Sequence, residues 1–408
     1  MRLREISGVD SDSEVTGFAI DHRKVAPGSV FGAFKGAVFN GEDFIPEAVT
    51  RGAVAVVARP EAPVDKAAHL ADEQPRRLFA QLAAKFFAPY PEIAVAVTGT
   101  NGKTSTVEMT RQMWRMVGHR SASIGTLGVT TSDDQVKTGL TTPDIVTFLS
   151  NVAGLKRMGI SHVAYEASSH GLDQHRAEGV PLAAAAFTNF SRDHLDYHLS
   201  MDDYFEAKMR LFDELLGPEG TAVVWTDDGK SDAVIERVKQ RGSKLMTVGR
   251  RGETIRLLDQ VPTPLGQTVT LAHEGKTHKL ALPLIGAYQA ANVLVAAGLV
   301  MATGTAFDAA FSAMQRVSPV RGRSGPPWSG TSCPRRRWSR RRRSPRPPAA
   351  PRCSGSSRPT RRPRWSPATT CWPSAATTPW RSGGSPAPRT SASSGSTTCR
   401  SCPDCVRR

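Results

Sequence analysis

The segment between residues 93 and 117 constrains the fold of this chain more than any other. An apolar run at 93–97 ends in a glycine-containing turn, Gly99-Thr-Asn-Gly102, and Lys103-Thr104 then open a helical pattern. A strand, a tight turn and a helix in this order direct backbone N–H groups and the positive end of the helix dipole at an anion. The segment therefore predicts a phosphate-binding loop within an α/β fold.

The residue types in this loop favour a nucleoside triphosphate. Lys103 would lie at the β- and γ-phosphates, and the Thr104 hydroxyl would bind Mg²⁺. The spacing is not that of the commonest phosphate loop, because Val97 occupies the position of its first glycine. A structural turn with a surface lysine is the alternative. We disfavour it because the strand, both glycines, the Lys-Thr pair and the helix occur in the required order.

Two more polar groups directly follow apolar strands. Glu166 ends the apolar run at 162–166, and His194 follows the run at 183–188. Doubly wound sheets place their ligand groups at the carboxyl ends of strands, and both side chains are suitable Mg²⁺ ligands beside a phosphate. A lone Glu or His is more often a solvated or core residue. Two such groups near a phosphate loop favour a magnesium site.

Apolar strands alternate with helical stretches over residues 89–323, which predicts a central, doubly wound, mostly parallel sheet. Residues 1–88 predict a separate small α/β domain. The expected strands lie at 29–34, 53–58, 93–97, 162–166, 183–188 and 221–225, the expected helices at 44–51, 76–87, 104–117, 145–158, 204–216 and 287–301, and a β-rich stretch at 244–284.

The chain changes composition after Arg323. Of the 53 basic residues 18 lie in residues 324–408, but only one of the 37 acidic ones does, so the net charge of +16 belongs to this stretch. All six cysteines lie there too, and apart from Ala, Cys and Trp its one aliphatic or aromatic residue is Val406. Such a stretch cannot bury enough apolar surface to offset chain entropy, so we predict a disordered basic tail.

The first 323 residues contain no cysteine and show no signal peptide, and no apolar run reaches the roughly 18 residues of a membrane span. We expect a cytoplasmic monomer without a membrane partner. The spacing Cys399-x-x-Cys402-x-x-Cys405 admits a metal knuckle, which the absence of histidine from the tail disfavours. The arginine-rich tail admits a nucleic-acid-binding protein as another class of function. Because the rest is nearly neutral and lacks a recognition motif, we expect no specific nucleic acid as a partner.

Six motifs together resemble the Mur ligase family, and within it the MurE branch, which adds the third amino acid of the peptidoglycan stem peptide. The loop alone would indicate only the wider superfamily, and a folylpolyglutamate synthase type of ligase stays the alternative among enzymes. The resemblance covers residues 1–323. The motifs are Thr98-Gly-Thr-Asn-Gly-Lys-Thr104, Gly125-Thr-Leu-Gly128, Leu140-Thr-Thr-Pro-Asp144, Glu166-Ala-Ser-Ser-His-Gly-Leu172, Asp193-His-Leu-Asp-Tyr-His198 and Tyr204-Phe-Glu-Ala-Lys-Met-Arg-Leu-Phe212.

The resemblance implies a role for each matching residue. Catalytic roles fall to Lys103, Glu166, His194 and Lys208, the last as a carbamylated lysine. ATP would be bound by Gly99, Thr100, Asn101, Gly102, Lys103, Thr104, Ser105, Asn292 and Arg323. The UDP-N-acetylmuramoyl-dipeptide would be bound by His22, Ala37, Val38, Phe39, Thr141, Thr142, Ser168, Gln174 and Arg176. Magnesium would be held by Thr104, Glu166, His194 and Lys208. Asp21-His22-Arg23 departs from the usual Asp-Ser-Arg, which weakens the expectation for His22.

The implied reaction is ATP-dependent amide formation. ATP would phosphorylate the D-glutamyl γ-carboxylate to an acyl phosphate, and the amine of a diamino acid would displace phosphate. We expect meso-diaminopimelate and leave lysine open, because the selecting elements of the family, Asp-Tyr-Ala-His and Asp-Asn-Pro-Arg, do not occur in this sequence. Residues 324–408 look like a GC-rich gene read out of frame. We therefore expect a frameshift near codon 323 and impaired turnover, with a natural basic tail as the alternative.

Overall fold

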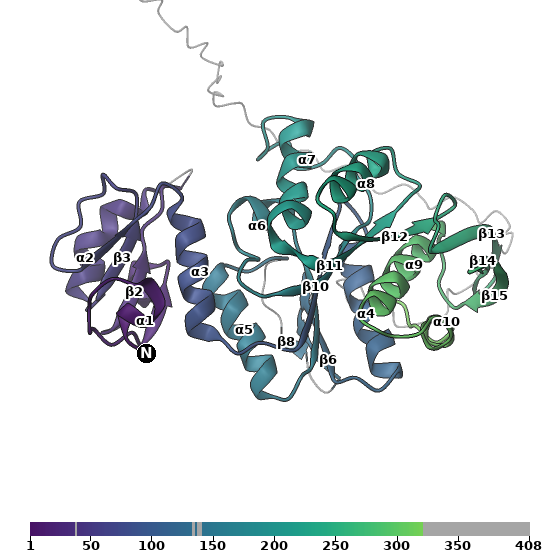
Figure 1. Cartoon of the computed structure of the whole chain (residues 1–408), viewed down its shortest axis with the longest axis horizontal. Coiled ribbons are helices and arrows are strands. Elements are labelled where there is room, and N and C mark those ends of the chain that lie inside the picture. Colours follow the sequence, from purple (N-terminus) through teal and green to yellow (C-terminus); the bar gives the residue numbers. More distant parts are fainter. Residues whose placement is uncertain (37–38, 133–134, 137–140, 321–408) are drawn as a thin grey trace, which may run out of the picture. The chain divides into compact units, whose positions relative to one another are not determined.

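The computed structural model describes residues 1–36, 39–132, 135–136 and 141–320, which form two sheets and the helices packed on them (Figure 1). The expectations for Ala37, Val38, Arg323 and the tail at 324–408 lie outside these residues. None of the helices in the described ranges has the length and apolarity that a bilayer crossing demands.

The first sheet contains four parallel strands in chain order. Every residue of its two central strands is buried, as expected of a parallel sheet that is covered on both faces. A longer helix, α3, then leads to the second sheet. The elements are α1 (Leu3–Ser7), β1 (Gly17–Ala19), β2 (Ser29–Gly32), α2 (Ile45–Thr50), β3 (Ala55–Ala58), β4 (Ala68–Ala71) and α3 (Pro75–Phe87).

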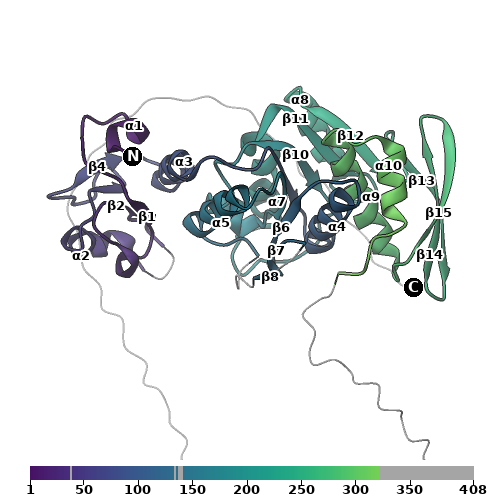
Figure 2. The same cartoon turned by 90° about the horizontal axis from the view of Figure 1, so that it is seen from below.

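The second sheet has eleven strands in the order β15-β14-β13-β12-β11-β10-β5-β9-β6-β7-β8. The strands from β13 to β6 in this order pair in parallel, and antiparallel strands extend both edges. The long strands β13, β14 and β15 stand out at one edge (Figure 2). The strands are β5 (Ile93–Thr98), β6 (Ser121–Gly125), β7 (Gly128–Thr130), β8 (Gln135–Val136), β9 (His162–Glu166), β10 (Leu182–Phe187), β11 (Leu216–Trp225), β12 (Lys244–Gly249), β13 (Ile255–Thr263), β14 (Gly266–His273) and β15 (Lys276–Leu282).

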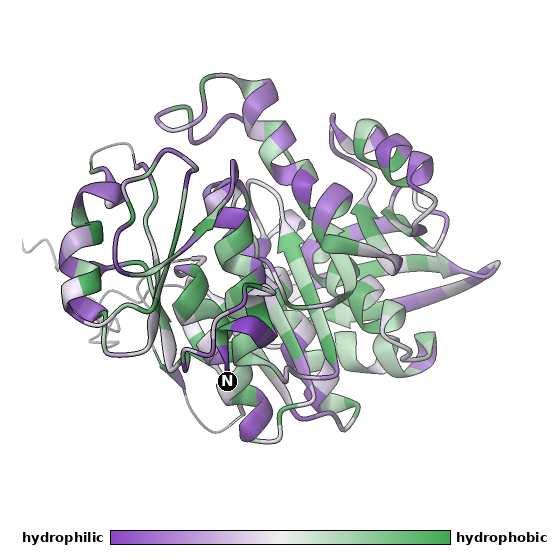
Figure 3. Ribbon diagram, turned by 60° about the vertical axis from the view of Figure 1, so that its left-hand side comes forward, coloured by the Kyte–Doolittle hydropathy of each residue, from purple (hydrophilic) through white to green (hydrophobic). Residues whose placement is uncertain are grey.

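Helices cover both faces of this sheet because the side chains of a strand alternate between the faces. Ala94 and Ala96 of β5 pack in one apolar cluster, and Val95 and Val97 pack in another. The central strands are coloured apolar over most of their length in Figure 3. The helices are α4 (Lys103–Met116), α5 (Ile145–Arg157), α6 (Ser169–Asp173), α7 (Met201–Arg210), α8 (Ser231–Gln240), α9 (Ala287–Ala302) and α10 (Phe307–Met314).

The predicted fold class is confirmed: a small α/β sheet precedes a larger, mostly parallel sheet with helices on both faces. The topology also places the candidate site. Strand β5 lies between β9 and β10, all three run in parallel, and so their carboxyl ends meet at one edge of the sheet. Open α/β sheets bind their ligands at the carboxyl ends of the strands, at the point where the strand order reverses.

Candidate functional site

The loop between β5 and α4 has a backbone that glycine alone adopts without strain at two positions. Gly99 has a φ of +140° and Gly102 a φ of +86°. A Cβ atom at Gly99 would lie 2.0 Å from Thr188 Oγ1, and one at Gly102 would lie 2.3 Å from Asn292 Oδ1. Gly102 is the N-cap of α4, and no side chain caps the N–H groups there. The helix N-terminus therefore has the geometry of an anion site.

The segment that follows β10 holds this loop in place. The Thr100 N–H donates to Asn189 O at 2.9 Å, and the Asn101 N–H donates to Asn189 Oδ1 at 2.8 Å. Thr188 Oγ1 donates to Asn101 O at 2.6 Å. On the other side the Thr100 hydroxyl lies 3.2 Å from the hydroxyl of the buried Tyr204. The loop is thus fixed before any ligand binds, which lowers the entropic cost of binding one.

Two lysines share one acceptor in the loop. Lys103 Nζ and Lys208 Nζ both donate to Gly99 O at 2.9 Å, and Lys103 also donates to Thr100 O at 2.8 Å. Burial, together with the charge of Lys103, lowers the pKa of Lys208 to about 6. Burial also lowers the pKa of Lys103, against the opposing effect of Glu166 and Asp193. A phosphate bound beside Lys103 would favour its charged form, because an opposite charge counteracts the effect of burial.

A buried carboxylate faces the start of α4. Glu166 accepts hydrogen bonds from Thr104 Oγ1 at 2.9 Å, from the Thr126 N–H at 2.7 Å and from Thr126 Oγ1 at 3.2 Å. Burial raises its pKa, and the Thr126 N–H and the charge of Lys103 oppose that rise. The structure therefore joins Glu166 and Thr104, which lie 62 residues apart in the sequence, at one point beside the loop.

His194 lies in the segment between β10 and α7. Its φ of +52° is unusual for a residue with a side chain, and its ring lies 4.9 Å from the ring of His170 and 5.9 Å from that of Tyr204. Its Nε2 is 3.6 Å from Asp193 Oδ2. Within the described residues no hydrogen bond joins His194 to Glu166, so the structure does not pair these two predicted metal ligands directly.

A row of hydroxyl groups leads away from Glu166. Thr141 Oγ1 lies 3.0 Å from Thr126 Oγ1, Thr142 Oγ1 donates to Glu166 O at 3.0 Å, and Thr142 Oγ1 also lies 3.0 Å from Ser168 Oγ. The predicted substrate-binding residues Thr141, Thr142 and Ser168 thus form one hydrogen-bonded row that starts at the loop.

The row continues to two longer polar side chains. Arg176 donates to Thr142 O at 3.5 Å and to Gln174 Oε1, and Gln174 donates to the Tyr197 hydroxyl at 2.9 Å. The structure therefore brings together all five substrate-binding residues that were predicted in the second sheet.

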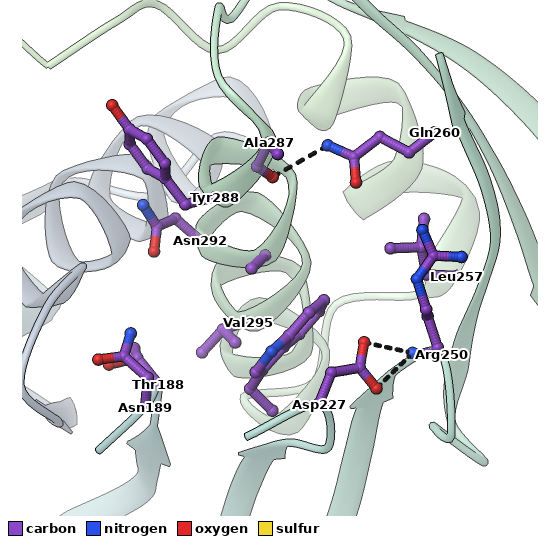
Figure 4. Close-up of a pocket in the computed structure, with 12 residues that line it drawn as sticks. Thr188, Asn189, Asp227, Arg250, Leu257, Gln260, Ala287, Tyr288, Asn292 and Val295 are labelled. Atoms are coloured by element: carbon purple, nitrogen blue, oxygen red, sulfur yellow. Dashed lines mark hydrogen bonds between the residues drawn. The ribbon is translucent and has the colours of Figure 1, made fainter. Parts of the chain in front are cut away.

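A cavity of about 310 Å³ adjoins the phosphate loop and is lined by α9 and by the ends of β11 and β12 (Figure 4). Asn189 and Asn292 line it and also contact the loop. Asp227 accepts from the Arg250 N–H at 2.8 and 3.0 Å, and Gln260 Nε2 donates to Ala287 O at 2.9 Å. With its mixed polar and apolar lining, this cavity has the size and chemistry of a nucleoside site.

The first sheet carries a separate cavity of about 450 Å³ with an aromatic wall. Predicted residues His22 and Phe39 both line it, together with Phe34 and Phe44. The His22 ring is stacked on the Phe44 ring at 4.3 Å, with 5° between their planes. Stacked rings of this kind suit a planar base.

Magnesium fits the oxygen groups at the loop. Glu166 and the Thr104 hydroxyl are hard oxygen donors, and Mg²⁺ binds a few such protein groups while phosphates and water complete its coordination. No group of three or more His, Cys, Asp or Glu side chains that could hold a metal ion occurs in the described part of the chain. The site thus suits a metal that arrives with a phosphate ligand better than a metal held by protein alone.

Comparison with known proteins agrees with this geometry. The Mur ligase middle domain matches residues 97–300, and a second domain of the Mur ligase family, described as catalytic, matches residues 14–87. The UDP-N-acetylmuramoyl-L-alanyl-D-glutamate–2,6-diaminopimelate ligase of Bradyrhizobium diazoefficiens is 42% identical over 334 residues, which are 79% of this chain and 69% of that protein. The chain belongs to the Mur ligase family.

Other Mur ligases extend the comparison. The ligase of the same name from Zymomonas mobilis is 54% identical over 318 residues, 78% of this chain and 65% of that protein. A solved structure of a UDP-N-acetylmuramoyl-L-alanyl-D-glutamate–2,6-diaminopimelate ligase superposes with a TM-score of 0.70 at 27% identity, over 79% of this chain and 68% of that one. MurF from Thermotoga maritima, solved with ADP, shares the fold with a TM-score of 0.51 at 20% identity, over 76% of this chain and 67% of that one. The chain spans about two thirds of the length of the Mur ligases it matches.

Sequence reasoning missed several residues of this Mur ligase site. Thr126 and Tyr204 lie within two of the six motifs, but neither was given a role. Of the polar side chains of the nucleoside-sized cavity, Asp227 and Arg250 come shortly after β11 and β12, and Gln260 lies within β13. The position of Asp227 directly after an apolar strand was a usable signal, whereas that of Tyr204 was not, because its role depends on contacts with a loop about 100 residues earlier.

Proposed function

We propose that the chain is an ATP-dependent ligase that joins an amino acid to UDP-N-acetylmuramoyl-L-alanyl-D-glutamate in peptidoglycan synthesis. One observation carries the proposal: the loop lysine, the second lysine on Gly99 and the Glu166–Thr104 pair meet at one edge of the large sheet, and the hydroxyl row starts there. The names of the similar ligases supply the substrate and the reaction.

In this proposal the loop residues 99–105 bind the phosphates of ATP, with Asn292 and Arg323 at the nucleotide, and Mg²⁺ neutralises charge on the transferred phosphoryl group. Lys103 and the N–H groups of the loop stabilise negative charge as it develops, and the hydroxyl row orients the muramoyl-dipeptide. A free carboxylate is a poor electrophile. Transfer of the γ-phosphoryl group to the D-glutamyl γ-carboxylate therefore gives an acyl phosphate, which the amine attacks with release of phosphate.

Lys208 has the properties of a lysine that reacts with CO₂. Its burial lowers its pKa to about 6, so the amine is largely neutral at physiological pH and therefore nucleophilic. A carbamate at Lys208 would place a negative charge beside Lys103 and attract it. An ammonium ion at Lys208 would repel Lys103 instead. We propose that Lys208 is carbamylated and that the carbamate, together with Glu166 and His194, orients the metal.

The remaining assignments are further parts of this proposal. We propose that residues 1–88 bind the UDP part in the aromatic cavity, with Ala37, Val38 and Phe39 close to it, and that residues 89–323 bind ATP. We further propose that residues 324–408 stand in place of an amino-acid-binding domain as the product of a frameshift. We propose meso-diaminopimelate as the added amino acid, in a monomeric, cytoplasmic enzyme.

The decisive experiment measures binding and turnover separately. ATP affinity with and without Mg²⁺ tests the loop, and ADP formation with UDP-N-acetylmuramoyl-L-alanyl-D-glutamate plus meso-diaminopimelate or lysine tests the ligase. We expect Mg²⁺-dependent ATP binding and, if any turnover occurs, a requirement for the UDP substrate. A chain that binds ATP but turns over with a folate and glutamate instead would be a ligase of the folylpolyglutamate synthase type. A chain that binds no ATP would contradict the proposal.

A further inference from the structure

The turn that follows α6 carries two of the predicted substrate-binding residues. Gln174 and Arg176 contact each other, and Arg176 also donates to Thr142 O at 3.5 Å. His175 lies between them in the chain, and its ring contacts Glu178 instead. Its φ of +55° is in the left-handed region, which a residue with a side chain seldom adopts. Such a backbone persists only where surrounding contacts hold it, so the contacts of His175 decide how its two neighbours are presented.

Arg210, the last residue of α7, supplies most of these surrounding contacts. Its guanidinium donates to Leu172 O and to Glu178 Oε1, the latter at 3.1 Å, and its Nη2 lies 3.0 Å from His175 Nδ1. Glu214, one helical turn later, accepts from the same guanidinium at 2.9 and 3.0 Å and so fixes its orientation. The network therefore holds the turn at a carbonyl before it, at a ring within it and at a carboxylate after it.

The network is largely shielded from water. The side chains of His175, Glu178 and Arg210 are only 14%, 10% and 18% exposed. Exposed ion pairs contribute little, whereas the loss of one partner from a buried pair leaves the other charge without compensation. Within the described residues no hydrogen bond joins Arg210 to Gln174 or to Arg176. Arg210 thus contacts the backbone and the far side of the turn, and not the two side chains that were predicted to bind substrate.

The same end of α7 also contacts the phosphate loop. Lys208, two residues before Arg210, donates to Gly99 O at 2.9 Å. Residues two apart on a helix point about 200° away from each other, so one helix end can contact the loop on one side and the turn on the other. Helix α7 therefore fixes where the substrate-binding turn lies relative to the loop that binds the phosphates.

We propose that Arg210, acting with Glu178 and His175, is a positioning residue that orients Gln174 and Arg176 for the UDP-N-acetylmuramoyl-dipeptide. Arg210 does not contact the substrate in this proposal and acts through the turn alone. The inference rests on the proposed function and adds three residues that were given no role. It assigns the network to the binding of the muramoyl-dipeptide and not to the binding of ATP.

The test is calorimetric titration of the full chain with UDP-N-acetylmuramoyl-L-alanyl-D-glutamate and, separately, with MgATP. We expect Arg210→Gln to weaken muramoyl-dipeptide affinity about tenfold, the worth of one charge-assisted contact, and to leave MgATP affinity unchanged. Arg210→Lys should fall between, because it keeps the charge but not the fork of donors. Arg237→Gln is the matched control. Arg237 pairs with Glu206 and Asp213 of the same stretch of chain, at 2.8 and 2.9 Å, and its loss should change neither affinity.

A double-mutant cycle separates positioning from general stabilisation. In a chain that already carries Gln174→Ala and Arg176→Ala, Arg210→Gln should not weaken muramoyl-dipeptide affinity further, because the side chains it orients are gone. Urea denaturation should show a similar loss of stability from Arg210→Gln in both backgrounds. If Arg210→Gln does not fold, His175→Gly tests the same network, because glycine adopts the positive φ without strain but lacks the ring. It should also weaken muramoyl-dipeptide affinity and spare MgATP affinity.

The outcomes separate this inference from the proposed function. Unchanged muramoyl-dipeptide affinity in Arg210→Gln or in His175→Gly would overturn the inference and leave the ligase proposal standing. The same loss from Arg210→Gln with and without Gln174 and Arg176 would also overturn it, as would an equal loss of MgATP affinity, because the network would then support the whole site. If the unaltered chain bound MgATP but not the muramoyl-dipeptide, the proposed substrate would fail, and this inference with it, but not the ATP site.

Discussion

The two candidate binding regions of this Mur ligase differ in the chemistry of their side chains. At the edge of the large sheet the groups around the loop are charged and buried: Lys103, Lys208 and Glu166 all have shifted pKa values because of burial. The cavity of the small sheet has an aromatic wall that includes Phe34 and the stacked pair of His22 and Phe44. The two charged residues of its lining, Asp21 and Arg23, pair with each other.

This difference indicates what each region is built to bind. Burying an uncompensated charge costs stability, so a fold keeps such charges where a ligand or a reaction uses them. An aromatic wall has no such cost, because it gains apolar contact in the empty protein as well. We therefore expect substitutions at the loop to reduce function while they leave or raise stability, and substitutions at the aromatic cavity to have smaller effects on both.

The largest effect is expected at Lys103. Lys103→Met removes the cation that faces the phosphates, and we expect ATP affinity to fall by roughly 100-fold, as for the loss of two charge-assisted hydrogen bonds. Calorimetric titration with MgATP measures this. Arg115→Gln, an exposed substitution near the other end of α4, is the control and should leave the affinity unchanged. An unchanged affinity in Lys103→Met would remove the distinction between the two regions.

We expect Lys208 to make the stability of the fold depend on pH. Its pKa is about 6 in the folded chain and 10.5 in the reference state, so between these values the unfolded chain binds more protons and stability rises with pH. The destabilisation that comes from burying the Lys208 amine is complete below pH 6 and disappears as the pH rises towards 10.5. We expect the unfolding free energy to rise by up to about 1.4 kcal/mol per pH unit from this residue alone, and Lys208→Met to lose that slope.

Urea denaturation at several values between pH 6.5 and 8.5 would measure the slope. Lys239→Met is the matched control, because Lys239 is an exposed lysine on α8 and should leave the slope as it is. If both variants show the slope of the unaltered chain, Lys208 is charged in the folded protein and the proposed carbamate loses its basis. A ¹³C NMR signal of a carbamate in ¹³C-bicarbonate, absent from Lys208→Met, would support it directly.

We expect Glu166→Gln to raise the stability of the fold and to weaken the effect of Mg²⁺ on ATP affinity. The pKa of Glu166 is raised in the folded chain, so its favourable contribution exists at acid pH and is lost as the pH rises through the folded value. At neutral pH Glu166→Gln therefore removes a penalty, and we expect it to stabilise the fold by up to about 1 kcal/mol. Mg²⁺ should then strengthen ATP binding about tenfold less than in the unaltered chain.

The exposed Glu236→Gln serves as the control for both measurements. A variant at position 166 that lost stability at neutral pH would show that the carboxylate holds the site together through Thr104 and Thr126 more than it costs by burial. The charge of Glu166 would then have a structural role, and the site of the large sheet would differ less from the aromatic cavity of the small sheet.

Much of the fold was predictable because the apolar periodicity of the sequence matches the observed strands and helices. Periodicity placed β9 at its observed bounds and located α4, α5 and α9 within one residue at each end. Strands β1, β4, β7 and β8 were missed because they are short or lie at edges, where little apolar sequence is needed. The helix expected at 204–216 begins earlier, at Met201, and its last turn at 211–215 is wound as a π-helix.

The candidate site was predictable where chemistry follows a strand directly, and not where it depends on long-range contacts. Glu166 and the loop could be found because each ends an apolar strand. The shared acceptor of Lys103 and Lys208, Gly99 O, could not, because a sequence does not show which helix crosses above a loop.

The smallest effect is expected at His22, where this sequence also departs from the family pattern. His22→Ala removes a ring stacked on Phe44, and we expect uridine affinity to fall about three- to tenfold, the worth of one aromatic contact. His22→Phe keeps the stack and should retain most of the affinity. Glu47→Gln removes the partially exposed pairing of Glu47 with His22 Nε2, 3.5 Å apart, and should change little, because such pairs contribute little.

These three variants decide whether the small-sheet cavity works through shape or through charge. If His22→Phe loses as much uridine affinity as His22→Ala, the imidazole acts through a hydrogen bond and not through its ring face. The cavity would then depend on a polar group as the large-sheet site does. If all three variants bind uridine like the unaltered chain, the base lies elsewhere, and the stacking of His22 on Phe44 serves only to close the wall between α2 and the segment after β1.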